Sequence, residues 1–255
     1  MMEFEESDAA IITVRALSTR LHKKCFQNLF ENKSMIEIVI ERAKKIGCKL
    51  ILATSSSIED NDLEEIAKRY QILCFRGSLK NKIHRWYNCF SKFNLKNAAI
   101  IDADDPSFSF STLNRALKQI KKTKAEIFFS SEKLMPGFIT YGFNYKGIEK
   151  MFQQAKEEGL DTDVIDVFIQ RAKLKSTTIE PLKNEIFHNQ IRLTVDYKED
   201  VLFYRKLFEK ISYLSESSEL LETIKKSNIS EINWFRHNEF LNNQKIFNMN
   251  VLSDK

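Results

Sequence analysis

The chain has 255 residues, of which 43% are hydrophobic and 29% are charged, with 6 Gly and 3 Pro. This composition is typical of a globular protein and excludes collagen-like, low-complexity and largely disordered chains. The apolar runs are far shorter than the roughly 20 residues that cross a bilayer, and residues 1–8 lack the order of a secretion signal. The net charge of +5 is spread among acidic residues, so we expect no nucleic-acid and no membrane partner.

The four cysteines are scattered along the chain without any C-x-x-C pair. A zinc site or a disulfide framework would need tighter spacing or a small secreted chain. We therefore expect Cys25, Cys48, Cys74 and Cys89 to be free thiols in a protein of the reducing cytoplasm.

The first half of the sequence alternates short apolar runs with amphipathic segments. The runs predict five strands, at residues 9–14, 49–54, 72–75, 98–101 and 126–130. Helical patterns lie between them, at residues 35–47 after the N-cap Ser34 and at 61–70, 83–93 and 113–121. Unbroken apolar strands are buried on both faces, and this alternation predicts an α/β fold with a mostly parallel sheet and helices on both faces.

The second half is less regular. It contains a strand candidate at 141–145, helices at 148–158, 164–172, 198–211 and 220–224, a strand at 191–195 that ends at Asp196, and a polar, Asn-rich tail. With so few Gly and Pro there is little room for a flexible linker. We expect one domain over residues 1–255.

Ligands bind open parallel sheets at the carboxyl ends of the strands. The loop after the first strand carries Arg15, Ser18, Arg20 and Lys24, and cations with hydroxyls at such a place suit a triphosphate. An exposed basic loop is the other interpretation. Neither G-x-x-x-x-G-K-[ST] nor G-x-G-x-x-G is present, which argues against P-loop hydrolysis and nicotinamide binding.

Three carboxylates, Asp102, Asp104 and Asp105, directly follow the apolar run at 98–101. Carboxylates this close repel one another unless a cation lies among them, and Mg²⁺ takes one or two carboxylates together with substrate phosphates. An aspartate-rich turn that closes a strand is the alternative. Asp196 alone also fits a helix N-cap followed by acidic first-turn residues.

Several segments together resemble a known family. The loop reads Arg-x-x-Ser-x-Arg-Leu-x-x-Lys, and IDADDP and IRLTVDYKED follow in order. They are similar to the cytidylyltransferases that activate sialic-acid-type sugars and 3-deoxy-octulosonate, with the spore-coat polysaccharide biosynthesis subgroup nearest. The resemblance covers residues 10–110 and 190–211. It assigns the two metal-binding aspartates of the family to Asp104 and Asp196.

The resemblance implies a Rossmann-like nucleotide-diphospho-sugar transferase fold, CTP as donor, Mg²⁺ as cofactor, an anionic small-molecule acceptor and a homodimer. Segment 134–190 is expected to shape the acceptor site and the dimer contact. The expected phosphate-binding residues are Arg15, Ser18, Arg20 and Lys24, and the candidates for base and ribose contacts are Ala53, Thr54, Ser55 and Arg76.

Two other interpretations use the same fold. One is a guanylyl- or uridylyltransferase acting on a sugar phosphate. The other is a nucleotide-binding subunit without activity, because Leu17, His22 and Ala103 stand where the family has Gly, Pro and Gly.

Overall fold

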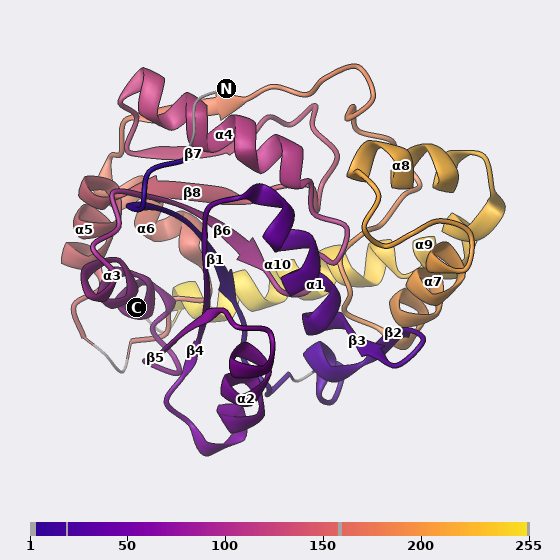
Figure 1. The fold of residues 1–255 in the computed structure, drawn as a ribbon, viewed down its shortest axis with the longest axis horizontal. Helices are drawn as coiled ribbons and strands as arrows, with labels where there is room; N and C mark the ends of the chain where they lie inside the picture. The colour runs from indigo at the N-terminus through magenta and orange to yellow at the C-terminus, as the bar shows by residue number, and fades with distance from the viewer. Residues whose placement is uncertain (1–3, 19, 158–159, 254–255) are drawn as a thin grey trace.

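The computed structural model describes residues 4–18, 20–157 and 160–253. Within them, a seven-stranded sheet has the order β5-β4-β1-β6-β8-β7-β9 and forms the centre of the molecule (Figure 1). Its strands are β1 (Asp8–Thr13), β4 (Lys49–Ser55), β5 (Leu73–Gly77), β6 (Asn97–Asp102), β7 (Ile127–Ser130), β8 (Tyr141–Asn144) and β9 (Ser176–Ile179). A small hairpin, β2 (Asn28–Phe30) and β3 (Lys33–Ser34), lies outside this sheet.

The sheet is mostly parallel, as the sequence predicts. β1 pairs in parallel with β4 and β6, while β8 runs antiparallel between β6 and β7. Thr13 at the end of β1 is in register with Ala53 and Asp102. The carboxyl ends of three neighbouring strands therefore meet at one edge.

Helices cover both faces of the sheet, and the side chains of β1 alternate between them. Ala10 and Ile12 join the core under α1 (Met35–Ala43), α2 (Asn61–Arg69) and α4 (Phe110–Thr123). Ala9 and Ile11 join the core under α3 (Lys82–Lys92), α5 (Tyr145–Gln154) and α6 (Ile165–Ala172). The unbroken apolar runs follow from this burial on both faces.

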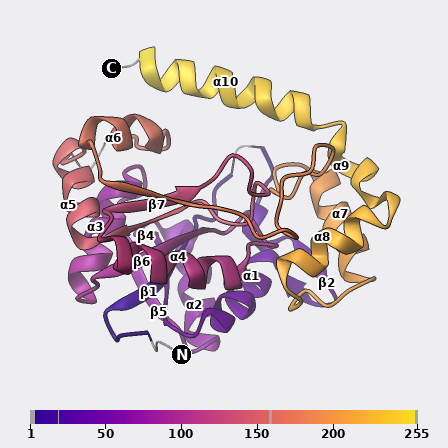
Figure 2. The same ribbon diagram turned by 90° about the horizontal axis from the view of Figure 1, so that it is seen from above.

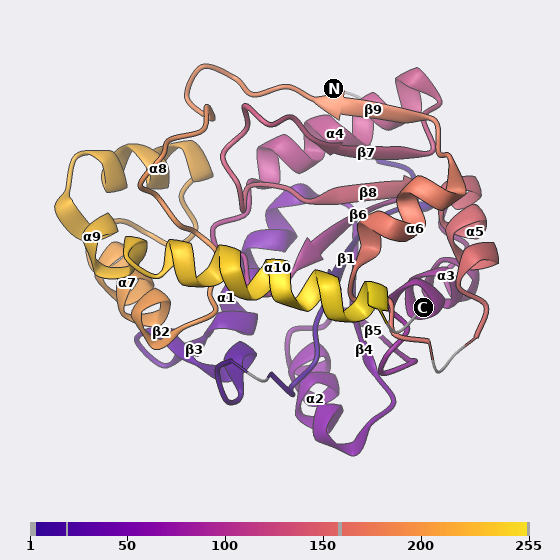
Figure 3. The same cartoon turned by 180° about the vertical axis from the view of Figure 1, so that it is seen from behind.

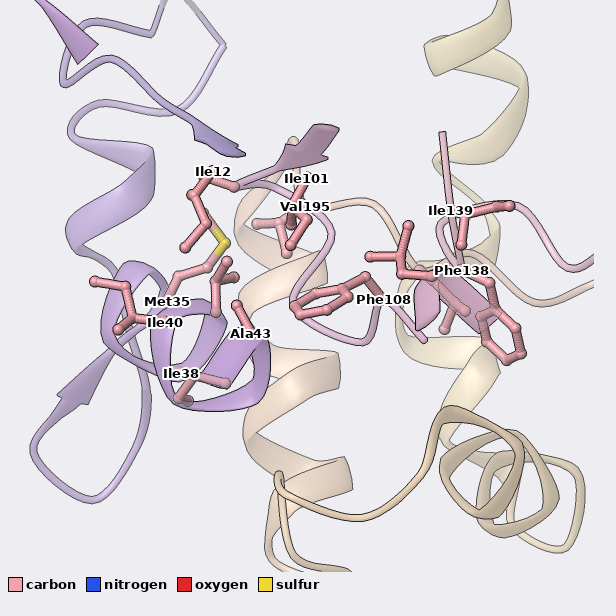
Figure 4. Close-up of a cluster of buried hydrophobic side chains, with 14 of the residues drawn as sticks. Ile12, Met35, Ile38, Ile40, Ala43, Ile101, Phe108, Phe138, Ile139 and Val195 are labelled. Carbon is pink, nitrogen blue, oxygen red and sulfur yellow. The ribbon is translucent and has the colours of Figure 1, made fainter. Parts of the chain in front are cut away.

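The C-terminal part extends the first of these cores. Its helices are α7 (Lys198–Phe208), α8 (Ser217–Lys225), α9 (Glu231–Trp234) and α10 (His237–Ser253), with the short 3₁₀ helix η4 (Asn228–Ser230) before α9. Three further 3₁₀ helices lie in the N-terminal part: η1 (Lys24–Phe26), η2 (Lys44–Ile46) and η3 (Ile58–Asp60). Figure 4 shows Val195 beside Ile101 on the side of the sheet that α1 covers. Figures 2 and 3 show α10 lying along the side of the molecule opposite the N-terminus.

One expectation for the second half is wrong. Residues 191–195 form no strand; the segment is extended and buries Ile191, Leu193 and Val195 in the core, which explains its alternating pattern. The Asn-rich tail is helical, as α10. None of the described helices is both long and apolar enough to span a membrane.

Gly147 allows a close approach between α5 and the start of β7. A Cβ added there would lie 2.1 Å from the carbonyl oxygen of Glu126, so the backbone would have to move. We expect Gly147→Ala to lower the free energy of unfolding by about 1–3 kcal/mol, measured by urea denaturation. Lys146→Ala, at the exposed neighbouring position, is the control, and an equal loss in both variants would contradict the packing argument.

Candidate active site

A pocket of about 610 Å³ opens at the carboxyl ends of β1 and β6. Its lining combines apolar residues with residues of both charges. The lining residues are Thr13, Val14, Arg15, Leu17, Ser18, Arg20, Lys24, Cys25, Met35, Lys82, Arg85, Asp102, Ala103, Asp104 and Asp163. The basic loop and the acidic cluster singled out in the sequence therefore face the same cavity.

Lys24 brings Asp104 and Asp196 together. Its Nζ donates to Asp104 Oδ2 (2.6 Å) and to Asp196 Oδ1 (3.2 Å). The backbone supports this arrangement, because Val195 N donates to Asp104 O (2.8 Å). Two acidic residues far apart in the sequence thus lie on either side of one ammonium group.

Asp196 is fully buried, and three cations surround its carboxylate. Oδ1 accepts from Arg20 Nη2 (2.6 Å) as well as from Lys24, and Oδ2 accepts from Arg192 Nη2 (2.8 Å). Burial by itself would raise the pKa of Asp196, but the charges of Lys24 and Arg20 outweigh it and lower the pKa overall. Asp196 is therefore ionised at neutral pH.

Arg192 holds Asp196 in place, and the sequence analysis did not single it out. Its guanidinium also donates from Nε to Asp200 Oδ1 (3.1 Å), while Asp200 Oδ2 accepts from Asp196 N (2.8 Å). Phe240 of α10 stacks over the guanidinium at 4.3 Å. The four-residue spacing of Arg192, Asp196 and Asp200 is the sequence feature that could have indicated this ion-pair network. A carboxylate clamped in this way is preorganised.

The pair of carboxylates fits Mg²⁺. This ion takes one or two protein carboxylates and completes its shell with water and substrate phosphate. The amino group of Lys24 already shows that a cation is stable between Asp104 and Asp196. No three His, Cys, Asp or Glu side chains gather as a metal site in residues 4–18, 20–157 and 160–253, so water and substrate phosphate would supply the other oxygens.

Another part of the pocket wall contains residues that the sequence analysis missed. Asp163 accepts from Arg15 Nη2 (2.8 Å) and pairs with Lys82 Nζ (3.1 Å). Arg85, on the first turns of α3, is buried in the same wall. Asp163 comes from segment 134–190, which the resemblance assigns to the acceptor site.

The residues expected to contact base and ribose do not line this pocket. Thr54 Oγ1 (2.8 Å) and Ser55 N (2.9 Å) both donate to Asp60 Oδ2, and Arg76 pairs with Glu64 (2.9 Å). Ala53 is buried within β4. These contacts engage the polar groups of Thr54, Ser55 and Arg76 within the fold. Asp60 Oδ1 also accepts from the backbone N of residue 16 (2.7 Å), so Asp60 connects the basic loop to β4.

The parallel sheet, the basic loop after its first strand and the acidic pair beyond it define a nucleotidyltransferase of the nucleotide-diphospho-sugar transferase fold. The family model described as "Cytidylyltransferase" matches residues 9–247. The chain therefore belongs to the cytidylyltransferase family, as the sequence motifs predict. The narrower similarity to the spore-coat subgroup stays a prediction.

Individual proteins resemble this chain in sequence or in fold. An uncharacterized protein of Methanocaldococcus jannaschii is 30% identical over 204 residues, which cover 77% of this chain and 81% of the relative. A cytidylyltransferase from Leptospira borgpetersenii serovar Hardjo-bovis superposes with a TM-score of 0.77 at 21% identity, over 86% of this chain and 94% of that one. A CMP:2-keto-3-deoxy-manno-octonic acid synthetase complexed with CTP has a TM-score of 0.61 at 13% identity, over 80% and 98% of the two chains. These two structures share the fold.

Proposed function

We propose that this protein transfers CMP from CTP to an anionic small-molecule acceptor, such as a sugar acid, in a Mg²⁺-dependent reaction that releases pyrophosphate and serves surface glycan biosynthesis. The observation that supports the proposal most is the convergence of Asp104 and Asp196 on one cation beside the basic loop. The free state of all four cysteines agrees with a cytoplasmic reaction.

Arg15, Arg20 and Lys24 bind the phosphates of the donor and neutralise their oxygens. Asp104 and Asp196 would hold Mg²⁺, which would supply further charge neutralisation at the donor phosphates. An acceptor oxygen attacks the α-phosphorus, a new P–O bond forms, and the bond to the leaving pyrophosphate breaks. Positioning and charge neutralisation are sufficient for such a transfer.

Covalent catalysis by a cysteine is not part of the proposal. Cys25 lines the pocket, but burial raises the pKa of its thiol to about 12. The thiolate is the nucleophilic form, so Cys25 stays protonated and contributes apolar surface to the pocket.

We also propose a homodimer to which segment 134–190 contributes, on the resemblance alone. The same segment supports an acceptor role through Asp163, which reaches the pocket wall. Light scattering after gel filtration tests the dimer.

The proposed donor is tested by measuring pyrophosphate release with CTP, UTP, GTP and ATP, each with Mg²⁺ and with EDTA, against a panel of sugar acids and sugar phosphates. We expect release from CTP alone, and only with Mg²⁺. Pyrophosphate release from UTP or GTP instead of CTP would show that this other nucleotide is the donor.

A subunit that binds nucleotide without turnover is the second candidate. Leu17 is 54% exposed where the family has the smaller Gly, and it lines the pocket beside Ser18. CTP binding in calorimetry together with no pyrophosphate release across the whole panel would favour this candidate over the enzyme.

A further inference from the structure

Arg85 lies in the pocket wall without a carboxylate to balance its charge. It is 1% exposed, and its guanidinium donates to Ser78 O (2.8 Å) and Thr13 Oγ1 (3.3 Å). Its Nε has no hydrogen-bond partner, and no acidic side chain lies within 4 Å among the residues that the structure describes. Burial lowers the pKa of Arg85 to about 10, and the like charge of Arg15 adds to the effect.

The neighbouring charges leave this wall positive. Lys82, one turn before Arg85 on α3, shares the carboxylate of Asp163 with Arg15. Asp163 is thus the carboxylate in direct contact with Arg15 and Lys82, while the charges of Asp60 and Asp102 act on Arg85 and Lys82 without such a contact. Over the whole lining, five basic residues face three acidic ones. One of the acidic residues, Asp104, is already paired with Lys24.

Asp163 is held at this place by the backbone around it. Asn81, the N-cap of α3, is buried and donates from Nδ2 to the carbonyls of Ala155 and Glu157 (2.8 Å each). Thr162 Oγ1 accepts from Ile83 N (3.4 Å). These contacts anchor the chain next to Asp163 on the start of α3, so the Asp163 carboxylate is a built part of the wall.

A buried charge without a counter-ion is costly, and an anion that enters the site removes that cost. We propose that Lys82 and Arg85 form a second anion-binding subsite that takes a phosphate or carboxylate group of a substrate, and that this group displaces Asp163 from Lys82. This inference rests on the proposed function. It adds a subsite on α3 to the phosphate-binding loop between β1 and η1.

The test compares Lys82→Met and Asp163→Asn with the wild type and with Lys80→Met, an exposed neighbouring lysine outside the pocket lining. Isothermal titration calorimetry measures Kd for two probes, inorganic pyrophosphate and 3-deoxy-octulosonate. We expect Lys82→Met to weaken binding about tenfold, the loss of one charge-assisted hydrogen bond. Asp163→Asn is expected to tighten binding about threefold to tenfold because it removes the competing carboxylate, while Lys80→Met changes nothing.

The opposite signs separate a binding role from a structural one, because a merely damaged fold would weaken binding in both variants. Weaker pyrophosphate binding in Lys82→Met assigns the subsite to a donor phosphate, and weaker 3-deoxy-octulosonate binding alone assigns it to the acceptor. Unchanged Kd values for both probes, no binding of either probe by the wild type, or weaker binding by Asp163→Asn would overturn the inference. Failure of the proposed function would instead appear as a wild type that releases no pyrophosphate from CTP with any acceptor, whatever the Kd values of the two probes.

Discussion

Asp104→Asn is expected to lower pyrophosphate release from CTP by about 10²–10³-fold, because removing one group that stabilises charge in the transition state costs roughly 3–4 kcal/mol. The fold is expected to survive, since the Asp104 side chain is 30% exposed and, within the described part of the chain, pairs only with Lys24. The measurements are pyrophosphate release at saturating CTP, CTP affinity with and without Mg²⁺, and the melting temperature.

The matched control is Asp62→Asn, an exposed carboxylate on α2 outside the pocket lining, which is expected to keep wild-type rates. In Asp104→Asn, the gain in CTP affinity on adding Mg²⁺ is expected to disappear. If Asp104→Asn releases pyrophosphate at the wild-type rate, Asp104 is not the proposed metal-binding residue. This conclusion holds whether or not the wild type depends on Mg²⁺.

Asp196→Asn is expected to lose activity and also stability. Its carboxylate is buried between Arg20, Lys24 and Arg192, and removing one partner from a buried ion pair typically costs about 3–5 kcal/mol. Melting temperature therefore distinguishes the two aspartates. An Asp196→Asn variant that melts with the wild type would show that Asp200 alone can hold Arg192.

The fold could be predicted well where burial fixed the pattern. The run at 98–101 is apolar at every position because β6 is covered on both faces, and it became a strand. Ser34 and Glu37 form the capping box that starts α1. Local signals of this kind depend on a few neighbouring residues, which the sequence shows directly.

The pattern at 191–195 misled for a physical reason. Alternate side chains point inward both in a strand and in an extended segment that crosses a core, and only backbone pairing distinguishes them. Here Val195 N bonds Asp104 O outside any sheet. The Asn-rich tail carried no prediction of secondary structure, because Asn has weak helix propensity, and residues 237–253 form α10.

For the site, the basic loop and Asp104 could be predicted as neighbours, because both follow strands that end at the same edge. Asp196 follows an extended segment instead, and only the family resemblance placed it beside Asp104. The motifs could not predict Asp163, which reaches Arg15 and Lys82 from segment 134–190, where no motif marks it. Arg85 resembles any arginine of an amphipathic helix. Its burial and lack of a counter-ion are visible only after α3 packs against β4 and β5.

Arg42→Met is expected to lower the free energy of unfolding by about 3–5 kcal/mol. Arg42 is fully buried on α1 and donates to the carbonyls of Tyr213, Ser215 and Phe108 and to Ser217 Oγ. Its guanidinium thereby connects α1 to the segment after β6 and to the start of α8.

Met keeps most of the volume of Arg42 but removes a donor from the half-buried carbonyls of Tyr213 and Ser215, while Phe108 O still accepts from Ser217 Oγ (2.8 Å). An acceptor left unpaired away from water costs about 1–3 kcal/mol. The opposing effect is that burial lowers the pKa of Arg42 to about 10, so the variant also escapes the cost of a buried charge. The control is Arg69→Met, an exposed pair with Glu37 worth less than about 1 kcal/mol. Urea denaturation of both variants decides between the two effects. If Arg42→Met is as stable as the wild type, the free-energy cost of burying the charge equals the stabilisation from its hydrogen bonds.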